Sequence, residues 1–231
     1  MSASPIATMF DRISPKYDAL NHLLSLNIDK VWRRKAAKTV TKKQPNAILD
    51  LATGTGDLAI ALAKRNPQAH IIGMDISEKM LDIGKAKVAQ QMMENQIELG
   101  LGDAASLPFE DNRFDVVTVA FGVRNFENLG KGLSEISRVL KPGGQAVILE
   151  FSMPEKFPVK QLYRFYFKRI LPIIGKRVSK DPHAYDYLPA SVERFQKPDG
   201  FLHILAEKGL KNGMKRSLSL GIVTLYKAEK R

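Results

Sequence analysis

The stretch Asp50-Leu51-Ala52-Thr53-Gly54-Thr55-Gly56-Asp57 decides the fold of this 231-residue chain. It includes the end of a short apolar run, Ala47–Ala52, which is typical of a buried parallel strand. Glycines at the carboxyl end of such a strand let the backbone approach a ligand closely, where open α/β sheets bind their ligands. The stretch therefore predicts a strand, a ligand-binding loop that includes Gly54 and Gly56, and a following helix.

Strands and helices are expected to alternate from residue 46 to residue 151. Strands are expected at 70–75, 97–102, 114–120 and 145–151, and helices at 58–64, 77–93 and 129–140. This alternation predicts an α/β fold with a doubly wound parallel sheet. Ser77 is the expected N-cap of the second helix, and Lys141-Pro142-Gly143-Gly144 is expected to end the third. The tail from Leu210 predicts two short strands that close as a hairpin.

Composition narrows the class of protein. The chain carries a net charge of +12, is 26% charged and 44% hydrophobic, and contains no cysteine. Disulfides, cysteine-ligated metals and a cysteine nucleophile are therefore excluded, and a reducing cytoplasmic location is expected. The first residues lack an apolar core, and no run approaches 18 apolar residues, so neither a signal peptide nor a membrane span is expected. No metal is expected, because the four histidines lack metal-ligand spacing.

Four carboxylates follow or flank the predicted strand ends. Asp50 and Asp57 flank the glycines, where their negative charges would repel a pyrophosphate and attract a ligand with ammonium and sulfonium groups. Asp75 ends the second strand, where it can accept hydrogen bonds from both ribose hydroxyls, as in NAD sites. Asp103 follows the third strand and suits the exocyclic amine of adenine. The alternative is that each aspartate is only a helix cap or turn residue. The spacing Gly54-x-Gly56-x-x-Ala59 also fits a dinucleotide-binding loop, so the glycines alone do not identify the ligand.

Over nearly its whole length, the chain resembles the class I S-adenosylmethionine-dependent methyltransferases. Within them it is similar to the ubiquinone/menaquinone biosynthesis C-methyltransferase family. The glycine loop and Lys141–Gly144 occur in many methyltransferases, whereas other segments are more specific. Those segments are Phe10–Ile13, Tyr17–Asn21 with Ser25 and Trp32, Phe121–Asn125, Arg138–Leu140, Leu149–Ser152, and Tyr185-x-Tyr187-Leu188 with Ser191.

This resemblance implies a seven-stranded, Rossmann-like sheet with six parallel strands, a last antiparallel strand, and helices on both faces. It also implies methylation of a ring carbon of a polyprenylated quinol: demethylmenaquinol, the benzoquinol precursor of ubiquinol, or both. Ala120 stands where relatives often have a cofactor-contacting serine, so a backbone group is expected to serve there, and Asp29 stands where the family usually has histidine. On the family pattern, S-adenosylmethionine would contact Thr55, Asp75, Asp103 and Ala104.

Arg124, Asn125 and Tyr17 are the expected catalytic residues. A hydroquinone carbon becomes nucleophilic when a neighbouring hydroxyl loses its proton, so a cation that stabilises the phenolate is useful. Arg124 fits this role but not that of a base, because its pKa lies above about 12. Asn125 would orient a water or hydroxyl, and Tyr17 would join the same polar chain. The alternative is that Arg124 pairs with Glu127 or Glu150 and that Asn125 caps the next helix.

Domain boundaries are expected near residue 46. Residues 1–45 would form a helical segment on the substrate side, and 46–231 the methyltransferase domain with a basic and aromatic insertion at about 156–200. Within it, Lys156–Lys180 interleaves cations with aromatic and aliphatic residues, which suits an interfacial helix on the anionic inner face of a membrane. The alternative is a lid packed on the domain. Self-association is compatible with the sequence.

Three other functions compete with the quinol methyltransferase. A nucleic-acid methyltransferase would suit the charge of +12, but the chain lacks an Asn-Pro-Pro-Tyr-like site and a catalytic cysteine, so no nucleic-acid partner is expected. An NAD-dependent oxidoreductase is suggested only by the glycine spacing. The last alternative is a non-catalytic S-adenosylmethionine-binding or membrane-scaffolding protein.

Overall fold

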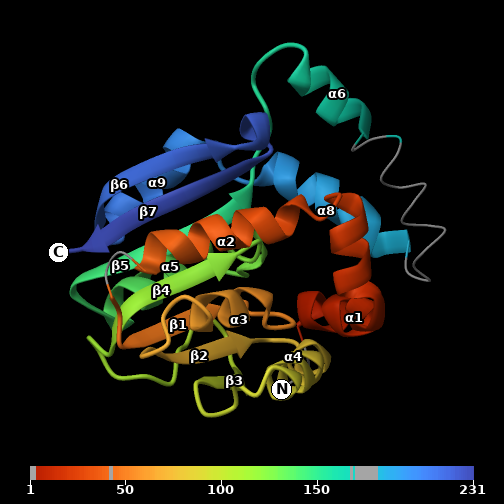
Figure 1. Ribbon diagram of the computed structural model, residues 1–231. Coiled ribbons are helices and arrows are strands. Elements are labelled where there is room, and N and C mark those ends of the chain that lie inside the picture. Colours follow the sequence, from red (N-terminus) through yellow and green to blue (C-terminus); the bar gives the residue numbers. More distant parts are fainter. Residues whose placement is uncertain (1–3, 42–43, 167–168, 170–181) are drawn as a thin grey trace.

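The strand that leads into the glycine loop lies inside a seven-stranded sheet with the order β3-β2-β1-β4-β5-β7-β6 (Figure 1). This computed structural model describes residues 4–41, 44–166, 169 and 182–231. Strands β1 to β5 pair in parallel, and β7 runs antiparallel to both β5 and β6. The predicted sheet, with its last strand antiparallel, is confirmed. The strands are β1 (Ala47–Leu51), β2 (His70–Asp75), β3 (Ile97–Leu101), β4 (Phe114–Ala120), β5 (Leu140–Phe151), β6 (Leu210–Leu218) and β7 (Val223–Lys230).

Helices cover both faces of the sheet, because successive residues of each strand point to opposite sides. Ile48 faces α2, α3 and α4, whereas Leu49 faces α5 and α9. The helices are α1 (Pro5–Leu24), α2 (Ile28–Thr41), α3 (Asp57–Ala63), α4 (Glu78–Gln90), α5 (Leu129–Val139), α6 (Val159–Phe165), α8 (Pro182–Arg194) and α9 (Pro198–Glu207). Short 3₁₀ turns lie at η1 (Val123–Asn125) and η3 (Ser219–Gly221).

Local signals account for most element boundaries. Ser77 caps α4 as predicted, since its Oγ accepts a hydrogen bond from the amide of Met80 at 3.3 Å. The turn expected at Lys141–Gly144 is instead part of β5, which begins directly after α5. Phe114 pairs with Leu140, and the register then shifts, so that the extra residues bulge out of the sheet. Gly143 has a φ of +72°, which a glycine adopts without strain.

Side chains of α1 fasten it to the loops that follow β1 and β2. Asp11 accepts hydrogen bonds from Ser77 Oγ at 2.6 Å and from the amide of Lys79 at 3.3 Å. Asp18 accepts one from Thr55 Oγ1 at 2.6 Å. Helix α1 therefore lies over the carboxyl ends of the strands, where parallel sheets bind their ligands (Figure 1).

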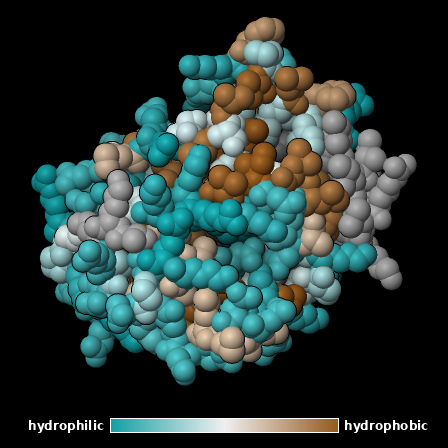
Figure 2. Space-filling view, viewed as in Figure 1, coloured by the Kyte–Doolittle hydropathy of each residue, from teal (hydrophilic) through white to brown (hydrophobic). Residues whose placement is uncertain are grey.

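Hydrophilic residues dominate the face shown in Figure 2, but hydrophobic side chains gather in its upper half, between α6 and the ends of α1 and α2. Among the described residues, no helix has the length and apolar character that a membrane span requires. Much of the basic segment expected at Lys156–Lys180 lies outside the described residues.

Candidate active site

The backbone of the glycine loop turns sharply after β1. Ala52, Gly54 and Gly56 all have positive φ angles, of 50°, 56° and 77°. The amide of Gly54 donates a hydrogen bond to Asp75 Oδ2 at 2.8 Å, and a Cβ built on Gly54 would meet no atom within 4 Å. The loop therefore leaves bare backbone facing open space beside a carboxylate at the end of β2.

A cavity of about 90 Å³, which we call the loop pocket, lies beside this loop. Helix α1 closes one side with Phe10 and Tyr17. The sheet side brings together five of the eight residues that the sequence predicts to bind the cofactor: Gly54, Asp75, Asp103, Ala104 and Ala120.

The other three predicted residues do not line the loop pocket. Asp50 lies buried beneath the loop, where its carboxylate accepts hydrogen bonds from Thr53 at 2.7 Å and Thr118 at 2.6 Å, and burial raises its pKa to about 6. Thr55 donates to Asp18 on α1. Gly56 packs against α4, because a Cβ there would lie 3.7 Å from the Cα of Gly84. For these three, as for the five at the loop pocket, cofactor contact remains a prediction.

The residues at the loop pocket fit an adenosyl ligand. Asp75 is buried, and burial raises its pKa, although backbone hydrogen bonds from Ser77 and Gly54 oppose that rise. Each of its oxygens accepts one of these amides, at 2.9 and 2.8 Å, so a second lone pair on each can accept a ribose hydroxyl. Asp103 uses Oδ1 to accept the amide of Ala105 at 2.9 Å, and Oδ2 can still accept an amine.

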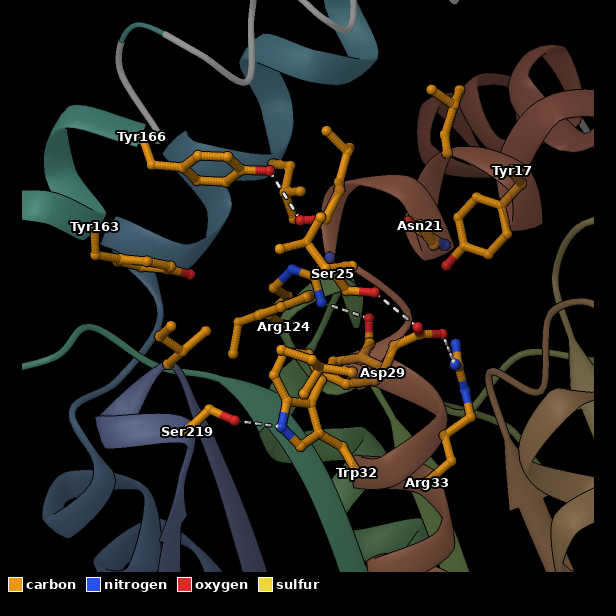
Figure 3. A pocket seen from close by; sticks show the side chains of 18 of the residues that line it. Tyr17, Asn21, Ser25, Asp29, Trp32, Arg33, Arg124, Tyr163, Tyr166 and Ser219 are labelled. Atoms are coloured by element: carbon orange, nitrogen blue, oxygen red, sulfur yellow. Dashed lines mark hydrogen bonds and ion pairs between the residues drawn. The ribbon is translucent and has the colours of Figure 1, made fainter. Parts of the chain in front are cut away.

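A second cavity of about 380 Å³, which we call the apolar pocket, lies next to the loop pocket (Figure 3). Its size falls in the range of small-molecule sites, and aromatic and aliphatic side chains dominate its walls. Phe10, Tyr17 and Phe121 line both pockets, so the two cavities share a wall. The other apolar and aromatic lining residues are Met9, Ile13, Leu20, Leu24, Leu26, Ile28, Trp32, Phe151, Val159, Leu162, Tyr163, Tyr166, Tyr187, Leu188 and Ile222. The polar ones are Asn21, Ser25, Asp29, Arg33, Arg124 and Ser219.

Arg124 projects into the apolar pocket from η1, directly after β4 (Figure 3). Its Nη1 pairs with the fully buried Glu150 at 2.7 Å and also bonds the carbonyl of Phe121. Its Nε donates to Ser191 on α8 at 3.2 Å. No described residue accepts a hydrogen bond from Nη2. The sequence offered the pairing with Glu150 as an alternative to a role in the site. In the structure Arg124 makes this ion pair and also lines the pocket.

Asn125 and Tyr17, the other predicted catalytic residues, lie at the boundary between the pockets. Asn125 lines the loop pocket, and its Oδ1 accepts a hydrogen bond from Tyr187, which lines the apolar pocket, at 2.9 Å. The alternative that Asn125 caps the next helix is wrong, because Asn128 caps α5. Burial raises the pKa of the Tyr17 hydroxyl, although Arg33 and Arg124 lower it in part. Tyr17 therefore stays protonated at neutral pH and can act as a hydrogen-bond donor.

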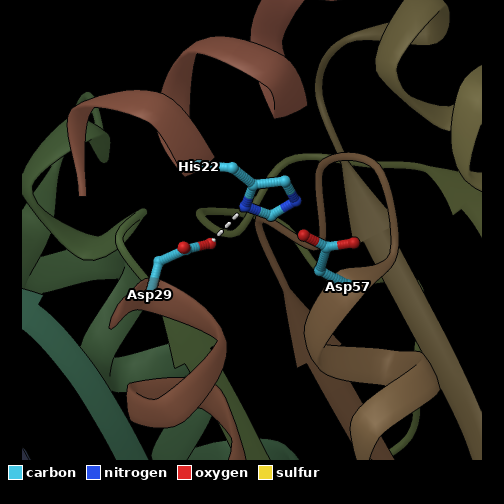
Figure 4. Close-up of side chains that lie close together, drawn as sticks. All are labelled: His22, Asp29 and Asp57. Atoms are coloured by element: carbon cyan, nitrogen blue, oxygen red, sulfur yellow. Dashed lines mark hydrogen bonds and ion pairs between the residues drawn. The ribbon is translucent and has the colours of Figure 1, made fainter. Parts of the chain in front are cut away.

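His22, Asp29 and Asp57 come together between α1, α2 and the glycine loop, a grouping that the sequence analysis missed (Figure 4). His22 Nδ1 lies 2.8 Å from Asp29 Oδ2. Arg33 pairs with Asp29, and Lys87 with Asp57. Because a cation already pairs with each carboxylate, this grouping is an ion-pair network with little negative charge left to attract a metal ion.

The hydrogen bonds of Arg124 to Ser191 and of Asn125 to Tyr187 were missed from the sequence, whereas the pairing of Arg124 with Glu150 was foreseen as an alternative. Glu150, Tyr187 and Ser191 lie 26 to 67 residues away along the chain and meet these side chains only in the folded protein. All three fall inside segments that carry the family resemblance. Their position in those segments was therefore the signal in the sequence that could have marked them as residues of the site.

The doubly wound sheet, the glycine loop backed by strand-end carboxylates, and a substrate-sized pocket behind a shared wall define a methyltransferase of the class I type. The ubiE/COQ5 methyltransferase family model matches residues 2–230, and the chain belongs to this family. The predicted class, an S-adenosylmethionine-dependent methyltransferase of quinone biosynthesis, is thereby confirmed. The oxidoreductase alternative is wrong.

Relatives match the chain over almost its full length. A demethylmenaquinone methyltransferase from Bacteroides fragilis is 47% identical over 225 residues, covering 97% of this chain and 92% of that protein. The ubiquinone/menaquinone biosynthesis C-methyltransferase UbiE of Geotalea daltonii is 46% identical over 226 residues, covering 97% and 96%.

Solved structures share the fold. The [4+2]-cyclase SpnF superposes with a TM-score of 0.70 at 16% identity, covering 99% of this chain and 96% of that one. An S-adenosylmethionine-dependent methyltransferase from Aquifex aeolicus superposes with a TM-score of 0.61 at 19% identity, covering 84% and 89%. A cyclase among these shows that the fold alone does not define the reaction.

Proposed function

We propose that this protein transfers a methyl group from S-adenosylmethionine to a ring carbon of a polyprenylated quinol, with demethylmenaquinol as the substrate and menaquinol as the product. One observation carries the proposal: an apolar pocket of about 380 Å³ shares a wall with the loop pocket and holds Arg124. An apolar cavity suits a prenylated ring, and the names of the relatives point to the same substrate. The benzoquinol precursor of ubiquinol is the second candidate substrate.

In this proposal the loop pocket holds the cofactor, which supplies a methyl group already activated on sulfur. Asp75 accepts the ribose hydroxyls, and Asp103 accepts the adenine amine. The backbone of Gly54, Ala104 and Ala120 packs against the ligand. Asp50, Thr55 and Gly56 support the loop or contact the ligand from beneath.

The chain's own contribution to the reaction is positioning and charge stabilisation. Tyr17, Phe10 and Phe121 separate the pockets, so the accepting carbon would lie close to the methyl group while apolar walls exclude water. Nη2 of Arg124 would stabilise the phenolate oxygen as its charge develops. Asn125, held by Tyr187, would orient the substrate hydroxyl or the water that accepts its proton. After methyl transfer, the ring carbon would lose its hydrogen as a proton to water and the oxygen would regain one, which restores the aromatic quinol.

Two short-tailed, soluble quinols test the substrate assignment. The single tryptophan, Trp32, lines the apolar pocket, so quenching of its fluorescence reports occupancy directly. We expect demethylmenaquinol to quench Trp32 and to accept a methyl group faster than the benzoquinol. Faster turnover of the benzoquinol would transfer the assignment to the ubiquinol precursor, and failure of both quinols would contradict the proposal.

The variant Asp75→Ala tests the cofactor site. Removing the carboxylate leaves the ribose hydroxyls unpaired, which costs about 1–3 kcal/mol, or roughly 5- to 150-fold in affinity for S-adenosylmethionine. Asp103→Ala should weaken binding similarly. Asp82→Ala, an exposed carboxylate on α4, is the matched control and should bind normally. Unchanged affinity in a folded Asp75→Ala protein, measured by calorimetry, would remove Asp75 from the site.

We also propose that residues 1–45 serve as the substrate-side segment, and that the protein works at the inner face of an anionic membrane as a peripheral enzyme. A polyprenyl tail is insoluble in water, so its enzyme must meet the bilayer or extract the substrate from it. The cations of Lys156–Lys180 would favour contact with anionic lipid. The alternative is that this segment packs on the domain as a lid.

A further inference from the structure

Exposed apolar side chains surround the mouth of the apolar pocket. Leu26, Ile28 and Leu162 line the pocket and are also exposed on the outer surface. They come from the turn between α1 and α2, the start of α2, and α6. The apolar wall of the pocket therefore continues onto the surface without a polar rim at these positions.

Three further exposed apolar residues extend this surface, each next to a residue that lines the pocket. Leu23 precedes Leu24, Phe165 precedes Tyr166, and Leu220 follows Ser219. Hydrogen bonds hold these elements together: Tyr166 donates to the carbonyl of Leu24 at 2.9 Å, and Trp32 donates to Ser219 at 2.8 Å. We call these six residues the mouth patch, and Figure 2 shows hydrophobic side chains gathered over this region.

The charge around the mouth patch has one dominant sign. In residues 21–38 and 155–166, the exposed cations are Lys30, Arg34, Lys35, Lys38, Lys156, Lys160 and Arg164. Over the same residues, Glu155 is the exposed acid, whereas Asp29 is buried. On α2, Ile28, Val31 and Lys35 follow at helical spacing, so one exposed stripe is apolar near the mouth and cationic further along.

We propose that the mouth patch docks on an anionic lipid bilayer, so that a polyprenyl tail passes from the acyl chains into the apolar pocket without crossing water. The identity of the tail rests on the proposed function, but the docking surface does not. Apolar side chains beside lysines and arginines are the composition that enters the headgroup boundary of anionic membranes. A second copy of the chain fits poorly, because it would bring two cationic surfaces together.

This docking surface includes the corner between α1 and α2 and is not limited to the basic segment expected from the sequence. The triple variant Leu23→Glu, Phe165→Glu, Leu220→Asp tests it with residues that are 51% to 77% exposed and lie outside the pocket lining. The matched control is Leu101→Glu, Met214→Glu, Met92→Asp, with residues 57% to 88% exposed. Leu220 and Met92 both have positive φ angles, which aspartate tolerates.

The measurement is flotation of the protein with vesicles of phosphatidylglycerol and phosphatidylcholine, without any quinol. We expect the wild type and the control variant to bind, more weakly at 0.5 M salt, and the patch variant to lose roughly tenfold or more in affinity. Equal loss in both variants would mean that net charge alone drives binding and would overturn the proposal. Absence of wild-type binding at low salt would overturn it as well.

Two further readouts separate the competing outcomes. Turnover of a short-tailed soluble quinol by the patch variant should equal that of the wild type, and this assay tests the proposed reaction independently of any membrane. Light scattering reports the oligomeric state. If the wild type is a dimer and only the patch variant is a monomer, the mouth patch is an interface between copies, and the membrane proposal is wrong.

Discussion

Arg124 and Glu150 form an ion pair that is almost excluded from solvent, with side-chain exposures of 7% and 0%. Removing one partner of such a pair leaves the other charge buried and costs about 3–5 kcal/mol of folding free energy. Activity lost in an Arg124 variant therefore has two sources, one structural and one chemical. Any test of Arg124 has to separate them.

A pair of variants makes this separation. Arg124→Ala should lower both the free energy of unfolding and kcat, with little change in S-adenosylmethionine affinity. Adding Glu150→Gln removes the orphaned charge, so it should recover part of the stability and none of kcat. Urea unfolding and steady-state kinetics measure the two quantities. Recovery of kcat together with stability would show that Arg124 serves only the fold.

Asp50 predicts a specific pH dependence of stability. Burial raises its native pKa to about 6, above about 3.8 in the unfolded chain, so between these values the native state binds more protons. The raised pKa of Asp50 therefore adds about 2–3 kcal/mol to the free energy of unfolding below about pH 4. This contribution is lost as the pH rises through 6.

Asp50→Asn isolates this contribution, because asparagine does not titrate and the other groups are unchanged. Urea unfolding from pH 4 to pH 7.5 measures the effect. Relative to Asp50→Asn, the wild type should lose about 2–3 kcal/mol of unfolding free energy over this range. A difference that stays constant across this range would contradict the raised pKa of Asp50.

Helix α1 acts as a cover on the loop pocket, held by Asp11 and Asp18. The loop pocket measures about 90 Å³, whereas sites for drug-sized ligands have about 300 Å³ or more, so we expect α1 to move outward if the cofactor binds there. Two hydrogen bonds resist this movement, from Ser77 to Asp11 and from Thr55 to Asp18. An ion pair between Lys87 and Asp18 at 2.9 Å also resists it.

Weakening these ties should speed cofactor exchange. We expect Asp11→Asn with Asp18→Asn to release bound S-adenosylmethionine about 2- to 5-fold faster, since each partly exposed contact contributes about 0.2–1 kcal/mol. Chase of radiolabelled cofactor gives the rate. Asp111→Asn, which breaks an exposed pair with Arg138, is the control and should leave the rate unchanged. An unchanged rate in the double variant would mean that α1 does not limit exchange.

The two pockets cannot respond independently, because Phe10, Tyr17 and Phe121 belong to both. A cofactor that moves α1 also moves the wall of the apolar pocket. Linkage requires that the effect be reciprocal, and couplings of this kind are typically 1–3 kcal/mol.

We therefore expect saturating S-adenosylmethionine to change quinol affinity by about 5-fold or more, with an equal effect of quinol on cofactor affinity. Trp32 quenching measures the first affinity and calorimetry the second. Phe10→Ala opens the shared wall and should reduce the coupling more than Ile13→Ala, which alters the apolar pocket alone. Equal quinol affinity with and without cofactor would refute the coupling.

Local sequence signals predicted the sheet, the glycine loop, the Ser77 cap and the acids Asp75 and Asp103. These features depend on periodicity and turn chemistry over a few residues, which a sequence displays directly. Parallel strands then bring their carboxyl ends to one edge of the sheet, so the position of the loop pocket also followed from the order of elements.

Tertiary structure decided what the sequence left open. The register shift after Phe114 set the start of β5, burial under two threonines gave Asp50 its environment, and the packing of α1 on α4 placed Asp18 over the glycine loop. Each outcome depends on contacts between residues far apart in the chain. Such contacts form only when packed elements exclude water together, and no local pattern encodes them.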